Sequence, residues 1–532
     1  MSEDNQPLYD PPSGWTWTSL NEVSAKIQDG THFSPKTQYR EPGPGRSLYL
    51  TSKNIRNSGL DLQDVAWIDL DAHQAIYSRC DPKEGDVLLV KDGVNAGVVC
   101  LNTLPEPFSL LSSVAIIRPN SAILPAYLRY YLTSPPGLRR VTGRMGGTAI
   151  RRIVLEQIRS LPIPVAPLAA QKAIADYLDE VLSDLDASLK ALTLGLAKLK
   201  RYRQAVLKAA VEGGVSREWR EARRGEIEPA AELLKRIFAE RRRRWEKSEL
   251  TKMRAKGIEP KDEKWKTKYP KRAEAEEYNL PDLPREWAWA TLDQIRKEDE
   301  RSLTDGPFGS NLKTEHYTVA GPRVLRLQNI APCEFVDEKA HISEDHFRTL
   351  KNHAIYPGDI AIRSLGKPAP IACLIPEQFG TGIVKADCIR FSSDDSLLDA
   401  RYAMYALNSQ PVQNRAAKLV HGLGRPRLGL GEIRKIPLPL PPREEQNVIA
   451  SEIDHVFSAV RALEETIARS LRRAVRLRQA ILEKAFRGEL VPRDPNDEPA
   501  AVLLERLRAH HLNAESPGER VRKAPVKPAW VG

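Results

Sequence analysis

Hydrophobic positions between residues 178 and 199 follow the repeat of a long helix packed on a second helix. Seven leucines lie at alternating steps of four and three residues: Leu178, Leu182, Leu185, Leu189, Leu192, Leu196 and Leu199. A seam with this average spacing predicts helix-on-helix packing along its whole length. Pro162, Pro164 and Pro167 precede the seam and Gly213 follows it, as expected at the two ends of a helix. We therefore expect a helix of about forty-five residues, roughly 65 Å long at 1.5 Å per residue.

The same pattern returns in the second half of the chain. A second apolar seam runs from Ile453 to Leu471 with one polar interruption at Glu464, and Gly488 follows it. Matching residues of the two copies are always 275 positions apart: Pro162 and Pro437, Pro164 and Pro439, Gln171 and Gln446, Gln204 and Gln479. Self-similarity over about fifty residues without a gap indicates a duplicated module. The two helices are therefore predicted to pair with each other in antiparallel orientation.

A mixed α/β segment precedes each predicted helix. Both segments open on alternating tryptophans, Trp15 and Trp17 in the first and Trp287 and Trp289 in the second. Each continues through short β-rich stretches, a short amphipathic helix and a glycine-rich basic loop, at 143–152 and 421–430. This order predicts an α+β fold with two mixed α/β domains, two long antiparallel coiled-coil helices and an internal pseudo-twofold repeat.

The repeat sets the expected boundaries. We expect an N-terminal tail (1–14), a first domain (15–160), a first long helical region (161–245), a basic linker (246–286), a second domain (287–435), a second long helical region (436–512) and a C-terminal tail (513–532).

Positive charge is concentrated in one segment. The chain has a net charge of +11, and residues 235–272 hold sixteen basic against six acidic residues. This segment continues well beyond the part that is duplicated. A charge run of this kind is more typical of a solvated helix than of a specific site, so it identifies no recognition surface by itself.

Motifs for catalysis, metal binding and membrane insertion are missing. There is no GxxxxGK[ST] phosphate loop, and Asp10-Pro11-Pro12-Ser13 lacks the aromatic residue of an adenine-methyltransferase motif. The five cysteines are scattered, and neither they nor the histidines have metal-site spacing. No apolar run approaches a membrane span, and the N-terminus lacks the features of a signal peptide. We therefore expect a cytoplasmic protein without a catalytic or metal site and without a membrane partner.

Two variable domains, each followed by a near-identical helix, resemble the specificity subunit of type I restriction–modification systems. The shared motifs are [LI]-P-[IL]-P-[VL]-x-P-x-x-x-Q before each helix, R-x-R-Q-A-[VI]-L near its end and a G-D-[VI] strand in each domain. The resemblance implies two target-recognition domains that read the halves of a split, asymmetric double-stranded DNA sequence. It further implies docking of two methyltransferase subunits, which use S-adenosylmethionine, and of restriction subunits, which use ATP and magnesium. The chain itself would be non-catalytic and would bind no cofactor.

Base edges are read by Arg, Lys, Asn and Gln side chains on DNA-facing loops. The expected DNA-binding residues of the first domain are Lys53, Asn54, Lys91, Arg144, Thr148, Arg151 and Arg152. Those of the second domain are Arg326, Gln328, Asn329, Arg363, Lys367, Arg425 and Arg427. Lys91 lies six residues after Gly85 whereas Arg363 lies five after Gly358, so these two are not expected to be equivalent. For any one of them, an ordinary surface cation or a phosphate contact is an equally good interpretation.

A structural adaptor is the alternative. Such a protein would hold partner subunits through its coiled coil without reading DNA. A third hypothesis, a self-contained DNA methyltransferase, is disfavoured because the cofactor motifs are absent from the sequence.

Overall fold

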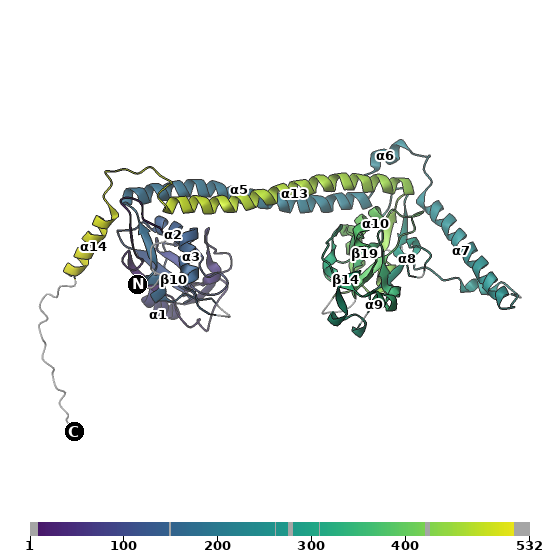
Figure 1. Cartoon of the computed structure of the whole chain (residues 1–532), viewed down its shortest axis with the longest axis horizontal. Coiled ribbons are helices and arrows are strands. Elements are labelled where there is room, and N and C mark those ends of the chain that lie inside the picture. The colour runs from purple at the N-terminus through teal and green to yellow at the C-terminus, as the bar shows by residue number, and fades with distance from the viewer. Residues whose placement is uncertain are drawn as a thin grey trace, which may run out of the picture. The chain divides into compact units, whose positions relative to one another are not determined.

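The computed structural model describes residues 9–147, 151–260, 262–274, 280–299, 301–307, 309–420 and 426–514. The chain forms two compact units, unit 1 (Met1–Thr193 and Ala468–Gly532) and unit 2 (Leu194–Ile467). Two helices of 44 residues, α5 (Leu168–Val211) and α13 (Arg443–Phe486), contribute to both units (Figure 1). The expected helix length is thus confirmed. The compact units divide the chain within these helices, whereas the sequence suggested boundaries at their ends.

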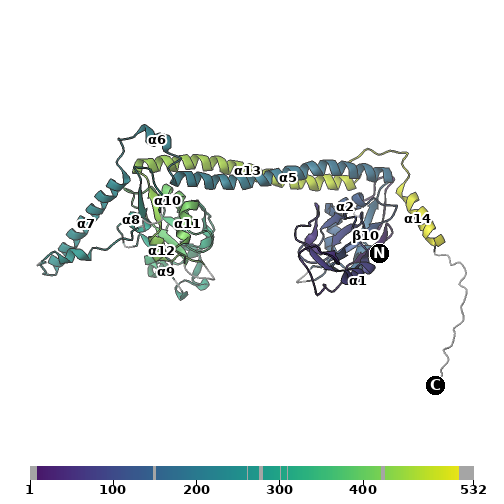
Figure 2. The ribbon, with the colours of Figure 1, turned by 180° about the vertical axis from the view of Figure 1, so that it is seen from behind.

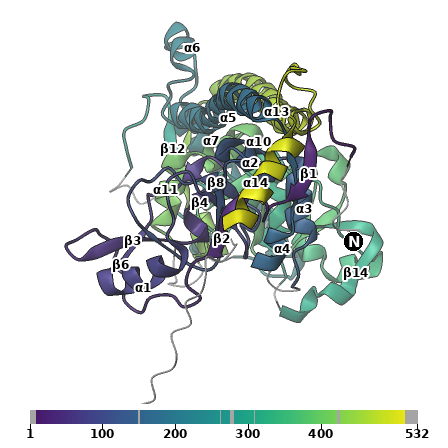
Figure 3. The same ribbon diagram turned by 90° about the vertical axis from the view of Figure 1, so that its left-hand side faces the viewer.

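The described residues of unit 1 form three sheets and a hairpin. Its strands are β1 (Thr16–Ser19), β2 (Ser24–Asp29), β3 (Arg46–Leu50), β4 (Ile55–Arg56), β5 (Gly59–Leu60), β6 (Ala66–Asp69), β7 (Val87–Val90), β8 (Val99–Leu101), β9 (Ser109–Leu110), β10 (Val114–Pro119) and β11 (Pro162–Val165). The strand orders are β2-β10-β7-β8, β6-β3-β9, β1-β11 and β4-β5. Its helices, besides the parts of α5 and α13, are α1 (Leu70–Cys80), α2 (Pro125–Thr133), α3 (Pro135–Gly143), α4 (Leu155–Arg159) and α14 (Ala500–Ala514), with a 3-10 turn at Ser52–Asn54. In Figure 3, β3, β6 and α1 lie together at one edge of the unit.

Unit 2 repeats this plan with additions. Its strands are β12 (Ala288–Thr291), β13 (Leu303–Asp305), β14 (Tyr317–Leu325), β15 (Ile330–Ala331), β16 (Glu334–Phe335), β17 (His341–Ile342), β18 (Ala354–Ile355), β19 (Ile360–Arg363), β20 (Ile371–Leu374), β21 (Gly382–Val384), β22 (Cys388–Phe391) and β23 (Pro437–Leu440). The strand orders are β13-β22-β19-β20, β17-β14-β21-β18, β12-β23 and β15-β16. Its α-helices are α6 (Arg217–Ala222), α7 (Ala230–Ala255), α8 (Leu292–Ile295), α9 (Glu344–Thr349), α10 (Ala400–Leu407), α11 (Gln410–Ala417) and α12 (Leu430–Arg434). Shorter 3-10 turns span Lys264–Lys268, Gly309–Asn311, Thr314–His316, Leu327–Asn329, Lys351–His353 and Glu377–Phe379.

The two long helices pack along the predicted seams. In unit 1 the first half of α5 lies beside the last half of α13, where Asp186 pairs with Arg478 at 2.5 Å. In unit 2 the last half of α5 lies beside the first half of α13, where Arg203 pairs with Glu464 at 2.8 Å. Partner numbers fall along α13 as they rise along α5, so the helices are antiparallel. Both helices end two residues before a glycine with positive φ, Gly213 at 77° and Gly488 at 69°, which favours a residue without Cβ.

A repeated glutamine ties each long helix to its own domain. In unit 1 the buried Gln171 amide accepts from Leu124 N–H at 2.8 Å and donates to the Ala122 and Ala166 carbonyls. In unit 2, Gln446 accepts from Asp399 N–H at 2.7 Å and donates to the Leu397 and Pro441 carbonyls.

Every partner in this junction is displaced by 275 residues between the copies. The sequence repeat is therefore also a repeat of contacts, and the predicted fold class is confirmed. Among the described residues, no helix combines the length and apolar character that crossing a membrane requires.

Candidate nucleic-acid interface

Asn54 and Asn329, two of the expected DNA readers, are buried and hold equivalent loops. Asn54 accepts from Thr51 N–H at 3.0 Å and donates to the Asp61 and Asp64 carbonyls at 3.1 and 2.9 Å. Asn329 accepts from Arg326 N–H and donates to the Val336 and Glu338 carbonyls, each at 2.8 Å. Their exposed fractions are 2% and 1%. Because the amide groups are buried and hydrogen-bonded inside the protein, this geometry fits a loop-shaping role.

Lys91 is buried in an ion pair with Asp29. The two side chains are each 2% exposed, and Lys91 Nζ lies 2.8 Å from Asp29 Oδ2. Arg79 donates to the other carboxylate oxygen at 2.9 Å. Burial alone would raise the pKa of Asp29, but the hydrogen bonds from Lys91 and Arg79 outweigh burial, so the pKa is lowered. The geometry therefore gives Lys91 a structural role rather than a surface from which to contact DNA.

Lys91 and Arg363 occupy different positions of the repeat. Lys91 N–H donates to the Ser113 carbonyl, and its own carbonyl accepts from Ile153 N–H. In unit 2 it is Ser364 that donates to the Asp387 carbonyl and accepts from Leu428 N–H. Arg363, half-buried at the end of β19, instead matches Val90. The two cations are thus not equivalent, as their spacing from the preceding glycine indicated.

Arg151 and Pro426 occupy equivalent positions in the basic loops of the two units. Gly93 N–H donates to the Arg151 carbonyl and Gly366 N–H to the Pro426 carbonyl, each at 3.3 Å. Arg152 is exposed, whereas its counterpart Arg427 pairs with Asp387 at 2.9 Å. Arg151 is also exposed and, within the described residues, donates to the Thr142 carbonyl at 3.4 Å.

Three further loop candidates complete this set. Arg144 is turned inward, where it donates to the Gln157 carbonyl and the Ser160 hydroxyl. Thr148 and Arg425 lie outside the described residues. Of the loop candidates that are described, Arg151 and Arg152 are the ones most open to a ligand.

Equivalent loops also carry candidates of different chemistry. Lys53 is exposed and pairs with Asp64 at 3.1 Å. Its counterpart 275 residues later, Gln328, is exposed and donates to Glu338 at 2.9 Å. Arg326 lies beside Glu338 as well, at 3.8 Å, and Lys367 is exposed at the far end of the β19 hairpin. The same framework therefore presents an ammonium group in one unit and an amide in the other.

Asp29-Gly30 and Asp305-Gly306 are a repeated pair that the sequence analysis missed. They end β2 and β13. A Cβ at Gly30 would lie 1.9 Å from the Leu110 carbonyl oxygen, and one at Gly306 would lie 2.1 Å from the Lys385 carbonyl carbon. Only glycine fits such an approach. The offset of 276 between the two Asp-Gly pairs was the signal that could have revealed them.

A buried carboxylate marks the base of the helix pair in unit 2. Glu445, fully buried, accepts from Trp287 Nε1 at 2.9 Å, from the Ser216 hydroxyl at 2.6 Å and from Arg220 at 2.5 Å. The residue 275 positions earlier, in unit 1, is Ala170.

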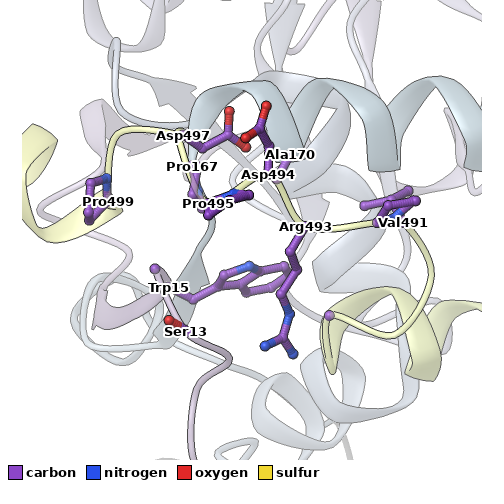
Figure 4. A pocket seen from close by; sticks show the side chains of 13 residues that line it. Ser13, Trp15, Pro167, Ala170, Val491, Arg493, Asp494, Pro495, Asp497 and Pro499 are labelled. Atoms are coloured by element: carbon purple, nitrogen blue, oxygen red, sulfur yellow. The ribbon is translucent and has the colours of Figure 1, made fainter.

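In unit 1 the corresponding place is a cleft of about 410 Å³ (Figure 4). Trp15, Ala170, Arg493 and Asp494 are among the side chains that line it. Neither the Trp15 indole N–H nor the Arg493 guanidinium has a polar partner within the described ranges. The cleft therefore corresponds to the unit 2 network without its carboxylate.

Comparison with known proteins gives the class. The family model for the type I restriction modification DNA specificity domain matches residues 12–193 and 343–473, together more than half of the chain. The chain belongs to this family. The prediction of a non-catalytic specificity subunit of a type I restriction–modification system is confirmed.

Individual relatives agree with this assignment. The specificity subunit of the type I restriction enzyme EcoKI from Escherichia coli K12 is 23% identical over 530 residues, covering 96% of this chain and 98% of the relative. The EcoDI specificity subunit from Escherichia coli is 24% identical over 396 residues, covering 73% and 76%. A chain solved in a study of the complex assembly and conformational transition of the type I R-M system superposes with a TM-score of 0.55 at 18% identity. That superposition covers 91% of this chain and 100% of the solved one, and it supports the fold.

Proposed function

We propose that each unit reads one half of a bipartite, asymmetric double-stranded DNA sequence. The observation that carries this proposal is that the two units share the same loop framework but carry different side chains at equivalent positions. Lys53 corresponds to Gln328, and Arg151 corresponds to Pro426. An ammonium group and an amide recognise different base edges, since Lys contacts guanine O6 and N7 whereas Gln pairs with adenine N6 and N7. Two halves built in this way are expected to select two different half-sites.

The proposal includes partners. The paired helices α5 and α13 would dock two methyltransferase subunits, which bind S-adenosylmethionine and methylate adenine N6. Restriction subunits that use ATP and magnesium would join the complex. In support, the relatives are named as specificity subunits of type I restriction enzymes, and the solved structural neighbour comes from work on complex assembly. With these partners, the cytoplasm is the expected compartment.

Methyl-adenine mapping of the host genome, with and without the gene, tests whether the protein recognises a DNA sequence. The expected result is a gapped, asymmetric two-part motif that disappears on deletion and returns with a plasmid copy. If the partner methyltransferase is expressed and no motif is lost, the proposal is wrong.

A second experiment tests whether the two units recognise different half-sites. The double variant Arg151→Ala/Arg152→Ala is expected to change or weaken one half of the motif, and Gln328→Ala the other half. If both variants altered the same half-site, the proposal that each unit reads one half-site would be wrong.

A further inference from the structure

Segment 242–271 of unit 2, here called the basic arm, has no second copy in the sequence, and its described residues form a projection. The first turns of α7 are packed into the core of unit 2 through Leu233, Leu234 and Ile237. Beyond them the helix extends away from the sheets of its own unit, and the chain then returns toward α8 (Figures 1 and 2). From Arg243 to the helix end at Ala255 the projection is about 20 Å long at 1.5 Å per residue.

Hydrogen-bonded arginines, one buried and one half-buried, hold both ends of the arm. Arg241, 1% exposed, donates to the Gln294 and Arg296 carbonyls at 2.7 and 3.0 Å and pairs with Asp394 at 2.5 Å. At the return, Arg272 donates to the Asp293 carbonyl at 2.5 Å. Charged groups held in this way are costly to leave unpaired inside a protein, so the base of the arm is well defined.

Aromatic side chains hold the two sides of the arm together. Trp245 on α7 stacks on Trp265 of the return segment, with ring centroids 6.0 Å apart and an interplanar angle of 26°. The edge of Tyr269 packs against the same Trp245 ring at 5.4 Å. Such ring pairs contribute stability beyond simple burial. The arm is therefore a folded hairpin rather than a loose charged linker.

The arm carries a large excess of positive charge, part of which is uncompensated. Its sequence holds twelve basic and five acidic residues, a net charge of +7. Five exposed cations have no ion-pair or hydrogen-bond partner within the described residues: Arg243, Lys247, Lys256, Lys268 and Lys271. Five others pair with an acidic side chain of the arm itself: Arg242, Lys252, Arg254, Lys264 and Lys266.

We infer that the basic arm binds the phosphate backbone of DNA outside the base-reading surface, an inference that rests on the proposed function. A DNA duplex presents one negative charge per about 1.7 Å of axis, a target that suits cations spread over about 20 Å. A protein partner is less suitable, since such interfaces have an apolar centre. Within the described arm, Ile258 is the large apolar side chain that is strongly exposed, and the tryptophans contact each other. Because phosphate contacts carry no base information, the arm adds affinity but not specificity.

The salt dependence of DNA affinity tests the arm. The full chain, assembled with its methyltransferase partner, would be titrated against a random-sequence 40-base-pair duplex and against its own target over a range of salt concentrations. The test variant changes the five unpaired cations to glutamine, R243Q/K247Q/K256Q/K268Q/K271Q. The matched control removes the same charge from the five paired cations, R242Q/K252Q/R254Q/K264Q/K266Q. Circular dichroism melting would establish that both variants are folded.

Each phosphate that the protein neutralises contributes about 0.9 to the magnitude of the slope of log K against log salt concentration. In the test variant this slope should therefore fall in magnitude by about two to four. The control should change by less than one, and the affinity ratio between target and random DNA should be unchanged in both. Equal slopes for wild type and test variant would overturn the inference. A test variant that kept its slope but no longer assembled with the methyltransferase would overturn it in favour of an acidic protein partner. If the wild-type complex bound neither duplex, the proposed function itself would fail, and this inference with it.

Discussion

Arg203 of α5 forms an ion pair with Glu464 of α13 at 2.8 Å, and both residues interrupt otherwise apolar helix seams. Arg203 also lies over the ring of Phe457, 5.1 Å from its centroid. Seen separately in the sequence, each polar residue looks like a defect in a heptad pattern. In unit 2 the two positions face each other. One register of the antiparallel pair therefore satisfies both, and a shift by one turn would leave each charge against an apolar seam.

A double-mutant cycle tests this relationship. Arg203→Ala and Glu464→Ala should each destabilise the chain, with a coupling free energy of about 0.5–1.5 kcal/mol because the pair is partly exposed. The measurement is denaturant unfolding of the four chains of the cycle. The double variant Arg203→Leu/Glu464→Leu should retain stability while losing the polar restriction on register. A coupling energy of zero would mean that the ion pair does not specify the pairing.

The Glu445 network and its incomplete counterpart give a matched pair of predictions. Glu445→Ala leaves the indole N–H of Trp287 without its acceptor in a buried site and removes the closest ion pair of Arg220, which keeps the Gly213 carbonyl at 2.9 Å. The expected cost is about 3 kcal/mol. Ala170→Glu in unit 1 should have the opposite sign, raising stability by about 1 kcal/mol, because the new carboxylate can accept from Trp15 and pair with Arg493.

Thermal melting of both variants and of an Ala170→Gln control is the measurement. The glutamine can accept from the indole but carries no charge, so it should stabilise less than glutamate. If Ala170→Glu lowered the melting temperature, the cleft would not be equivalent to the Glu445 site.

Much of the fold could be predicted from the sequence, because each pattern occurs twice and a pattern in one half could be checked in the other. The helix seams, the prolines before them and the glycines after them are local signals, and the structure has helices at those places. The candidate site was harder to predict. Asn54 and Lys91 have the chemistry of base-reading side chains, but the Asn54 amide is used by backbone groups of its own loop and the Lys91 ammonium by Asp29 on β2. A linear pattern of polar residues does not distinguish a side chain that shapes a loop from one that faces a ligand.

Asn54 and Lys53, adjacent in sequence, are therefore expected to behave oppositely. Asn54→Ala should lower the free energy of unfolding by about 1–3 kcal/mol, because it removes a buried amide that holds three backbone groups of its loop. Lys53→Ala removes an exposed ion pair and should change stability by less than about 0.5 kcal/mol. In a DNA-binding titration the order should reverse, with Lys53→Ala showing the larger direct loss at a temperature where both variants are folded. A stable Asn54→Ala variant with altered base preference would restore Asn54 as a DNA reader.

The buried Asp29–Lys91 pair predicts a specific dependence of stability on pH. Lys91, Arg79 and His32 are the charged or titratable groups that face Asp29, and its pKa is lowered in the folded protein. A carboxyl group with a depressed folded pKa contributes stability above its unfolded pKa of about 3.9 and loses that contribution as the pH falls through the folded value. Between about pH 5 and pH 3, wild type should therefore lose more stability than the double variant Asp29→Leu/Lys91→Met, in which this group cannot titrate.

Unfolding of both proteins at pH 7, 5, 4 and 3 isolates the contribution, since the other carboxyl groups are common to them. Lys91→Met alone should cost about 3 kcal/mol at pH 7, because Asp29 keeps its charge in a buried place and loses its buried partner, while Arg79 and His32 remain beside it. Restoring neutrality with Asp29→Leu should recover much of that loss. Parallel pH profiles for wild type and the double variant would show that Asp29 is not the group responsible.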